Sequence, residues 1–275
     1  MHEDKIIFGN VIGKGGYSTV YHCKINEQEV VSKVVNKGDE NSFWNEVKIL
    51  EKLNHKYIIK PLKVMDMMLI SEFKGDDLFV WLEQGLCKDE KIKILWQLVE
   101  AIKYIHSKNI CHLDLKLENI IYDGDSITII DFGFSHAYNN ERKFKILKKP
   151  CGTKHYVSPE VYNRKIYNGF DADMWSFGIV TFALFLNFFP YFYPSFHDKG
   201  FFHIMKRSIE SLCDYYNKTE KYNETPKFVI KIIEKLLKPA GERYTIQKIE
   251  YLLHYHKIVN KKSFPLRCLI PHTCL

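Results

Sequence analysis

The sequence predicts an α+β protein with two lobes: a small β-rich lobe with one main helix, then a larger, mostly helical lobe. Runs of β-type residues and glycine-rich turns lie before about Phe73, and long segments with helical periodicity follow it. A chain of 275 residues is long enough for each lobe to bury a core. We predict one domain over residues 1–275, with lobes at about 1–73 and 74–256 and a short tail at 257–275.

The small lobe begins with three β-type runs, KIIFGNVIG, STVYHCKI and EVVSKVV. A glycine cluster separates the first two runs, and the turn residues Asn26 and Glu27 separate the second from the third. The next segment, ENSFWNEVKILEKL, carries apolar residues at helical spacing: Phe43, Val47, Leu50 and Leu53. The pattern predicts two hairpins followed by a helix.

The larger lobe begins after FKGDD, Phe73 to Asp77, which we expect to be a connector because Gly75 and the acids favour a turn. DEKIKILWQLVEAIKYIHSKN then predicts a long amphipathic helix. The stretch from Met174 to Tyr193 has no charge, and its length alone would suit a membrane span. Polar residues and Pro190 interrupt it, so we predict a buried central helix and no membrane span.

Net charge and cysteine content indicate which ligands the protein binds and in which cellular compartment it lies. The net charge of +7 permits an anionic ligand such as a nucleotide, but the lysines are dispersed and we expect no nucleic-acid binding. The seven cysteines form no CxxC pair. That usage predicts a reduced intracellular compartment, cytoplasmic or nuclear, rather than a disulfide scaffold.

GKGGYSTV, Gly13 to Val20, could be one of three phosphate-binding structures: a Walker loop, a Rossmann loop or a glycine-rich hairpin turn. A Walker loop would need Ser or Thr after the lysine, where Gly15 stands. A Rossmann loop would need a helix, whereas Thr19, Val20 and Tyr21 favour a strand. A glycine-rich hairpin turn remains, whose backbone N–H groups can approach phosphate oxygens. From this loop alone, an ordinary glycine hairpin is an equal alternative.

Lys33 lies in the β-type run VVSKVV. If Val31 and Val35 face the interior, Lys33 on the same side of the strand does too. A buried lysine needs a partner, and Glu46 on the following helix is the candidate. The alternative is an ordinary exposed lysine.

HLDLKLENI, His112 to Ile120, precedes two β-type runs joined by the turn DGDS. Pairing these runs, 120–122 and 127–130, would bring Asn119 and Asp131 together, and their oxygens suit Mg²⁺. Asp114 lies five residues before Asn119, so it could accept a proton from a hydroxyl near the metal site, and Lys116 could neutralise a phosphate there. A surface hairpin with scattered acids is the alternative.

Together these segments resemble the eukaryotic protein kinase family over about residues 5–255. The motifs occur in the family's order: GKGGYSTV, VVSKVV, NEVKILEKLNH, IHSKNICHLDLKLEN, DFG, CGTKHYVSPE, DADMWSFGI and PAGERYT. Lys116 and Thr153 resemble the serine/threonine branch. The resemblance implies the bilobal kinase fold, with ATP and Mg²⁺ as cofactors and transfer of the γ-phosphate to Ser or Thr hydroxyls of a protein.

The resemblance also implies a role for each matching residue. Asp114, Lys116 and Lys33 would be catalytic, and Asn119 and Asp131 would hold Mg²⁺. ATP would be bound by Ile12, Gly13, Gly15, Gly16, Ser18, Val20, Lys33, Glu46, Ser71 and Glu72. Ser71 would be the gatekeeper beside the adenine, with Ile70 as the alternative. Glu160 and Arg243 would form a buried ion pair, and Asp173 would brace the catalytic loop, residues 112–120.

Four positions depart from the usual family pattern: Ser18, Leu113, Leu117 and Ser158. Leu113 replaces an arginine that in many kinases binds a phosphate on the activation loop. From His136 to Gly152 the sole hydroxyl side chain is Tyr138. That segment is instead basic, with Arg142, Lys143, Lys145, Lys148 and Lys149. We therefore predict activity without activation-loop phosphorylation.

Glu118 and Asp77 stand where basic-directed kinases bind substrate arginines, although both could be ordinary solvated acids. We expect a monomer. The alternative function is a pseudokinase or scaffold that binds ATP without transfer. A small-molecule kinase is a further alternative, but CGTKHYVSPE and DADMWSFGI favour a surface that accepts peptides.

Overall fold

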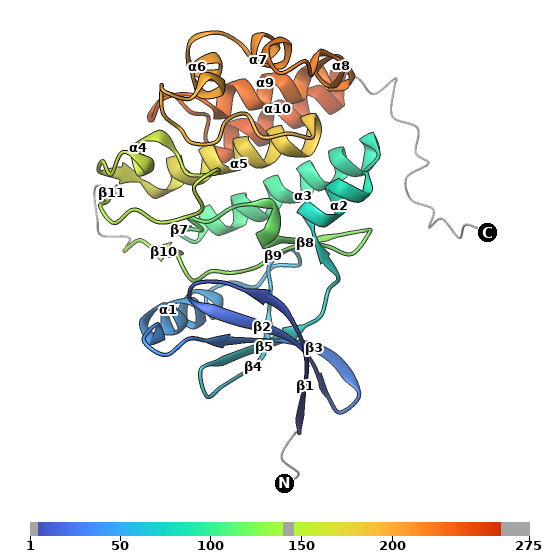
Figure 1. The fold of residues 1–275 in the computed structure, drawn as a ribbon, viewed down its shortest axis with the longest axis vertical. Coiled ribbons are helices and arrows are strands. Elements are labelled where there is room, and N and C mark those ends of the chain that lie inside the picture. Colours follow the sequence, from blue (N-terminus) through green and yellow to red (C-terminus); the bar gives the residue numbers. More distant parts are fainter. Residues whose placement is uncertain (1–4, 140–145, 260–275) are drawn as a thin grey trace, which may run out of the picture.

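The computed structural model describes residues 5–139 and 146–259, except for the side chain of Val259. Figure 1 shows a sheet-containing lobe below a larger helical lobe, as the sequence predicts. The last strand of the large sheet ends at Glu72, and the lobe boundary at about Phe73 stays a prediction. The expected tail at 257 starts inside the last helix, and residues 260–275 lie outside the described residues.

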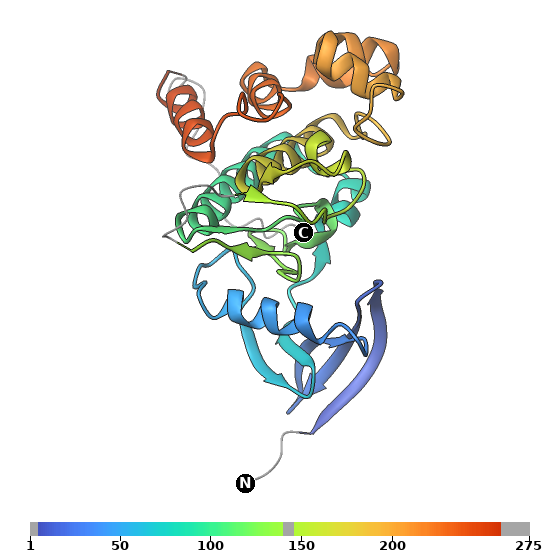
Figure 2. The ribbon, with the colours of Figure 1, turned by 90° about the vertical axis from the view of Figure 1, so that its left-hand side faces the viewer.

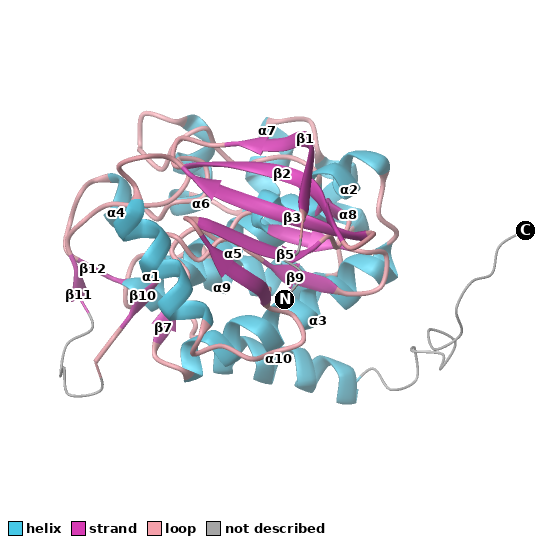
Figure 3. Ribbon diagram, turned by 90° about the horizontal axis from the view of Figure 1, so that it is seen from below, coloured by secondary structure: helices cyan, strands magenta, loops and turns pink. Residues whose placement is uncertain are grey.

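The small lobe is built on a five-stranded antiparallel sheet with the order β1-β2-β3-β5-β4. Its strands are β1 (Ile6–Lys14), β2 (Ser18–Ile25), β3 (Gln28–Val35), β4 (Pro61–Met65) and β5 (Met68–Glu72). The predicted turn between β2 and β3 is tight, because Asn26 and Glu27 have φ angles of 48° and 66°. Figure 3 shows this sheet from below, in front of the helices.

Helix α1 (Glu40–Leu50) is the main helix of the small lobe and buries Phe43, Val47 and Leu50 as predicted. It ends before Leu53, so the expected extension to that residue is wrong, although Leu53 is still buried in the core. Figures 1 and 2 place α1 beside the sheet, level with the part of the sheet that is nearer the larger lobe. The helix can therefore carry side chains toward the space between the lobes.

The larger lobe is mostly helical. Its helices are α2 (Leu78–Gln84), α3 (Lys88–Ser107), α4 (Pro159–Tyr162), α5 (Gly169–Leu186), α6 (Lys199–Lys206), α7 (Ile209–Tyr215), α8 (Thr219–Glu224), α9 (Lys227–Leu236) and α10 (Ile246–Val259). Helix α3 is the predicted long amphipathic helix. The backbone N–H of Cys87 donates to Glu90 at 2.7 Å and satisfies a donor at its start.

Helix α5 is the buried centre of this lobe. Among the described residues it is the helix long and apolar enough to cross a membrane, yet 89% of its apolar window is buried in the protein. The prediction of a buried helix is confirmed, but the expected range from Met174 to Tyr193 is wrong. The helix starts at Gly169 and ends at Leu186, because Asn187 adopts a left-handed conformation with φ of 60°.

Short strands hold the loops between the lobes. They are β6 (Asp76–Asp77), β7 (Ile110–Cys111), β8 (Ile120–Tyr122), β9 (Ile127–Ile129), β10 (His136–Ala137), β11 (Ile146–Leu147) and β12 (Tyr167–Asn168), with a 3₁₀ turn at Leu117–Asn119. The predicted hairpin is present as β8 and β9. The expected connector at Phe73 to Asp77 does more than turn, because its last two residues pair with β8.

Candidate active site

A cavity of about 320 Å³ lies between the glycine-rich loop and the larger lobe. Its predicted lining residues are Gly15, Gly16, Ser18, Lys33, Glu46, Asp114, Lys116 and Asp131. It is also lined by Tyr17, Val35, Ser42, Phe43, Gly133, Phe134, Gly152 and Thr153, which had no assigned ligand contact. Most of these stand next to a motif residue in the chain, which is the signal that could have identified them.

Tyr17, at the tip of the glycine-rich loop, contacts Phe134 from the opposite lobe. The two rings meet edge-to-face, with centroids 5.5 Å apart. Asn36 fixes the other side of the loop, donating its side-chain N–H to the Gly16 carbonyl at 3.0 Å and its backbone N–H to the Tyr17 carbonyl at 2.9 Å. The loop is thus held across the mouth of the cavity.

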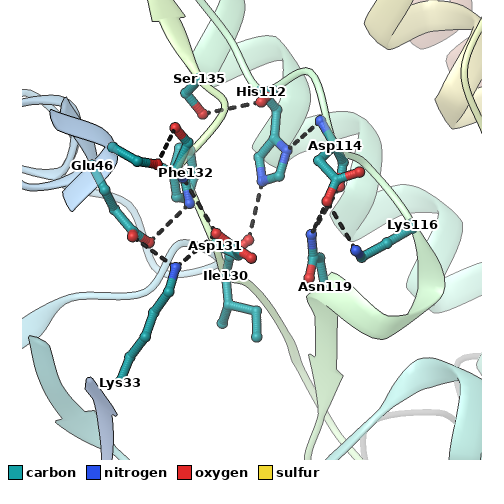
Figure 4. Close-up of polar contacts among 12 residues, drawn as sticks. Lys33, Glu46, His112, Asp114, Lys116, Asn119, Ile130, Asp131, Phe132 and Ser135 are labelled. Atoms are coloured by element: carbon teal, nitrogen blue, oxygen red, sulfur yellow. Dashed lines mark hydrogen bonds and ion pairs between the residues drawn. The ribbon is translucent and has the colours of Figure 1, made fainter. Parts of the chain in front are cut away.

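Lys33 is the cation at the centre of the cavity. Its Nζ lies 2.7 Å from Glu46 Oε2, the expected partner, and 2.8 Å from Asp131 Oδ1. Burial alone would lower the pKa of Lys33, but the charges of Glu46 and Asp131 raise it above its usual value. Lys33 therefore remains a fixed positive charge (Figure 4).

The two sides of β3 are buried to different extents. Val31 and Val35, on the same side, are only partly buried, whereas Val30 and Ser32 on the opposite side are fully buried. The condition set on the sequence, that Val31 and Val35 face the core, is met in part, because half-buried Val35 packs against the main core. Val35 also lines the cavity between the lobes, and Lys33 on the same side of the strand reaches that cavity.

Glu46 connects α1 to the segment around Asp131. Besides binding Lys33, it accepts the backbone N–H of Phe132 at 3.0 Å, and the Phe132 ring is fully buried. Asn45 and Ser42 extend this contact by donating to the carbonyls of Ser135 and Gly133 at 2.8 and 3.2 Å. The small lobe is thereby joined directly to the segment that carries Asp131.

Asp131 follows β9 and has a φ of 62°, a left-handed conformation that is unusual for a residue other than glycine. Burial tends to raise the pKa of its carboxyl group, but the neighbouring Lys33 charge holds the pKa below its usual value. The Gly133 N–H also donates to it at 3.3 Å. Asp131 is therefore held as a carboxylate.

Asp114 is positioned by the backbone that precedes it. Leu113 has a φ of 67°, and the N–H groups of His112 and Leu113 both donate to the buried carboxylate of Asp173, at 2.8 and 2.7 Å. These two bonds hold the strained turn and direct the Asp114 side chain into the cavity. Asp173 thus makes the bracing contacts that the resemblance implies.

The Asp114 carboxylate accepts from three side chains. Lys116 Nζ lies 2.9 Å from Oδ2, Thr153 Oγ1 lies 2.8 Å from Oδ1, and Asn119 Nδ2 lies 3.2 Å from Oδ2. Lys116 also donates to Thr153 at 3.0 Å. The arrangement places the Asp114 carboxyl group beside a second cation, as a proton acceptor near a transferred phosphate would require.

Asn119 and Asp131 fit a magnesium ion that is shared with phosphate oxygens. Asn119 donates its amide N–H to the Asp114 carbonyl at 2.9 Å, so its amide oxygen is directed away from Asp114. Asp131 supplies a carboxylate from the other strand, at the same open end of the hairpin (Figure 4). No group of three or more His, Cys, Asp or Glu side chains suited to a metal occurs in residues 5–139 and 146–259. Two oxygen donors completed by phosphates match how Mg²⁺ is usually bound.

The remaining predicted ATP residues lie outside the cavity lining: Ile12, Gly13, Val20, Ser71 and Glu72. Ser71 pairs with Val31 across β3 and β5, on the same side of the sheet as Lys33. Ile70 points the other way and packs with Cys23 and Val30. Of the two gatekeeper candidates, this alternation places Ser71 on the cleft side.

Comparison with known proteins agrees with this geometry. The family model of the protein kinase domain matches residues 6–253. The chain belongs to the protein kinase family. Its curated relatives include a CBL-interacting serine/threonine-protein kinase 10 of Arabidopsis thaliana, which is 29% identical over 281 residues, or 94% of this chain and 55% of the relative.

Two other relatives show a similar range. CBL-interacting protein kinase 2 of Oryza sativa subsp. japonica is 31% identical over 218 residues, or 74% of this chain and 48% of the relative. A probable myosin light chain kinase of Dictyostelium discoideum is 32% identical over 215 residues, or 71% of this chain and 54% of the relative. This chain therefore spans about half the length of these relatives.

In this kinase domain the predicted pair of Glu160 and Arg243 is formed. Arg243 Nη2 donates to Glu160 Oε2 at 2.7 Å, and Arg243 Nη1 donates to the Asp171 carbonyl at 2.9 Å. Burial tends to raise the pKa of Glu160, but Arg243 holds it below its usual value. The pair joins the end of the activation segment, by which we mean residues 131–160, to the helical core.

Glu118 and Asp77, the proposed contacts for substrate arginines, both make internal hydrogen bonds. Glu118 Oε2 accepts the hydroxyl of Tyr156 at 2.9 Å. Asp77 Oδ1 accepts the N–H groups of Phe79 and Val80 at 2.9 and 3.0 Å and caps α2. These bonds give each acid a structural role, and their use in substrate recognition stays a prediction.

Leu113 lies in an apolar cluster on the far side of the catalytic loop. The buried members of this cluster are Cys111, Leu113, Tyr138, Val161, Tyr167 and Ala172, and Leu113 is 8% exposed. Leu147 and Cys151 of the activation segment pack against it. The segment is also held by the pairing of β11 with β12 and by the Tyr167 hydroxyl, which donates to the Lys149 carbonyl at 2.8 Å. Arg142, Lys143 and Lys145 lie outside the described residues.

Proposed function

We propose that this protein transfers the γ-phosphate of ATP to Ser or Thr hydroxyls of a protein substrate. The observation that carries the proposal is a single cavity in which two networks meet. Lys33, Glu46 and Asp131 form the first, and Asp114 with Lys116 belongs to the second. One network suits a bound triphosphate and the other suits an entering hydroxyl.

In this mechanism the chain mostly positions groups and neutralises charge. Lys33 binds phosphate oxygens. Asp114 accepts the proton of the substrate hydroxyl as the new oxygen–phosphorus bond forms, while the bond from the γ-phosphorus to the bridging oxygen breaks and ADP leaves. Lys116 compensates the charge on the transferred phosphoryl group. Mg²⁺, held by Asn119 and Asp131, would supply further neutralisation of the phosphates. The Tyr17–Phe134 contact would limit water at the mouth of the cavity.

The direct test uses purified protein, Mg-ATP and a generic basic protein as phosphate acceptor. Wild-type protein should transfer phosphate, and Asp114→Asn should lower kcat by about 10²–10⁴-fold while ATP still binds. A scaffold that binds ATP without transfer would give no signal from either protein. Equal activity of wild type and Asp114→Asn would point to a contaminating kinase and would contradict the proposal.

We also propose that the activity needs no activation-segment phosphate. Leu113 cannot bind a phosphate, and the apolar cluster around it already packs against the segment. Between His136 and Gly152 the one hydroxyl side chain is that of Tyr138. This hydroxyl accepts the Gly169 N–H at 2.9 Å inside the cluster, and burial raises its pKa. A kinase that attacked Tyr138 would first have to unpack it.

Protein shown to be free of phosphate by intact mass should therefore be active in its first turnovers. The rate of substrate phosphorylation should be constant from the start, without a lag that ends when the kinase itself becomes phosphorylated. The proposal fails if activity arises only after phosphorylation within residues 134–157. Monomeric state and intracellular location remain predictions beside it.

A further inference from the structure

Exposed aromatic side chains gather on the larger lobe where α4 meets the loop between α5 and α6. Phe192 is 59% exposed and Tyr162 is 38% exposed. Tyr162 stacks on Tyr193 with ring centroids 6.1 Å apart, and Phe192 contacts Tyr193 at 5.9 Å and His155 at 4.8 Å. We call His155, Tyr162, Phe192 and Tyr193 the aromatic platform. His155 and Tyr193 are half-buried beside the two exposed rings, and a connected group of aromatic rings at the surface is typical of a binding site.

The backbone beneath the aromatic platform is fixed. The Phe192 N–H donates to Asp198 Oδ2 at 2.9 Å, while Asp198 Oδ1 caps α6 by accepting the Gly200 and Phe201 N–H groups. The preceding residue, Tyr191, is buried, and its hydroxyl accepts the Trp175 indole N–H at 2.7 Å. Phe192 is therefore held outward by an anchored loop, which lowers the entropy lost when a partner binds it.

The aromatic platform is continuous with the catalytic cavity. Thr153 lines the cavity and donates to Asp114 at 2.8 Å. The next residue, Lys154, is exposed, and its Nζ lies 4.4 Å from the centre of the Phe192 ring and 5.1 Å from that of Tyr193. A substrate chain that reaches Asp114 can therefore extend over the platform, since an extended chain advances about 3.3 Å per residue.

Charge on this part of the chain favours an acidic partner. From 146 to 207 the cations are Lys148, Lys149, Lys154, Arg164, Lys165, Lys199, Lys206 and Arg207, and the acids are Glu160, Asp171, Asp173 and Asp198. All four acids make internal bonds: Glu160 to Arg243, Asp171 to the Gly241 N–H, Asp173 to the catalytic loop and Asp198 to α6. The cations dominate the exposed surface, and Lys154 lies on the platform itself.

We propose that the aromatic platform binds an apolar residue of the protein substrate, flanked by an acidic residue that pairs with Lys154. This inference rests on the proposed kinase function and specifies its substrate class: sites with an apolar–acidic pair near the acceptor hydroxyl, on one side of it. Aromatic rings supply most of the contact area, and Lys154 adds charge selectivity.

The test measures kcat/KM of the full chain on synthetic peptides with one serine among alanines. One series places Phe at each flanking position in turn, and a second adds Glu beside that Phe. We expect Phe at one position, or at two adjacent ones, to raise kcat/KM about tenfold, with a further gain from Glu. Phe192→Ser should bring the Phe ratio close to one, and Lys154→Glu should remove the gain from Glu.

The matched control is Tyr251→Ser, which removes an aromatic ring that is 69% exposed on α10. It should leave both ratios unchanged, and thermal unfolding should confirm that all variants are folded. A wild-type protein without preference for Phe at any position, or a preference that persists in Phe192→Ser, overturns the inference. So does light scattering that shows a dimer lost in Phe192→Ser while the peptide ratios stay unchanged. A complete absence of transfer, including to a generic basic protein, instead overturns the kinase proposal itself.

Discussion

Leu113 and Asp114 are neighbours in the chain, yet their side chains lie in opposite environments. Asp114 accepts from Lys116, Asn119 and Thr153 inside a polar cavity. Leu113 packs among apolar side chains that include those of the activation segment. Asp173 makes this division possible, because it binds the backbone N–H of Leu113 and holds its left-handed conformation.

The comparison separates two requirements of a kinase domain. The polar side retains each group that phosphate transfer needs, and those groups depend on one another for charge balance. The apolar side holds the described part of the activation segment by packing, through Leu147 and Cys151. Mutation and pH should therefore act very differently on the two sides.

The largest effect should come from Lys33→Ala, which breaks the polar side at its centre. Glu46 and Asp131 would lose their shared cation and bound phosphates would lose a contact, so kcat/KM should fall by about 10²–10³-fold. Steady-state phosphate transfer measures this. Lys24→Ala, which removes an exposed lysine paired with Glu29, is the control and should leave activity unchanged. Retention of most activity by Lys33→Ala would refute the role given to Lys33.

Leu113→Arg should have the next largest effect, this time on stability. The usual family residue would be placed in a site built for an apolar side chain, and an unpaired buried charge should cost about 3–5 kcal/mol of unfolding free energy. Leu113→Met, a swap of similar volume, should cost less than about 1.5 kcal/mol. Denaturant unfolding compares the two. If Leu113→Arg is as stable as Leu113→Met, the apolar cluster does not exclude charge as we describe.

The two sides also differ in what the sequence could predict. Motif residues such as Lys33, Glu46 and Asp114 have fixed spacing and a required chemistry, so their meeting in one cavity followed from the resemblance. The second partner of Lys33, Asp131, was missed because the two residues are far apart in the chain and only the closed arrangement of the lobes joins them. The sequence predicted correctly that Lys33 points inward from β3, but it did not show that this side of the strand lines the cavity between the lobes.

The apolar side was much less predictable. The sequence indicated that Leu113 could not bind phosphate, but no sequence pattern predicted that Tyr138, Tyr167 and Leu147 would pack around it. These residues come from separate segments and meet through two-residue strands too short to produce a periodic signal. Helix ends were misjudged for a similar reason, since the left-handed Asn187 ends α5 inside an apolar run.

Glu160→Gln tests a charged contact outside the cavity, and its effect should be intermediate. Arg243 holds the pKa of Glu160 below its usual value of 4.5, so the stabilising contribution of the carboxylate is present above that value and is lost as pH falls through the folded-state pKa. At neutral pH the substitution should cost about 1.5–3 kcal/mol. Urea unfolding at a series of pH values should show the wild type and the variant converging in acid. A constant difference down to about pH 3 would contradict this.

The smallest effect is expected for the pH dependence of Leu113→Ala. This substitution should cost about 3 kcal/mol by leaving a cavity, and the cost should be the same within error between about pH 6 and 8. Burial raises the pKa values of the cluster's titratable groups, the thiols of Cys111 and Cys151 and the hydroxyls of Tyr138 and Tyr167, so none ionises in that range. The substitution leaves the nearby contact between His106 and Asp173 in place. A cost that changed by more than about 1 kcal/mol across this range would mean that an ionised group supports Leu113, and the contrast with Asp114 would have to be redrawn.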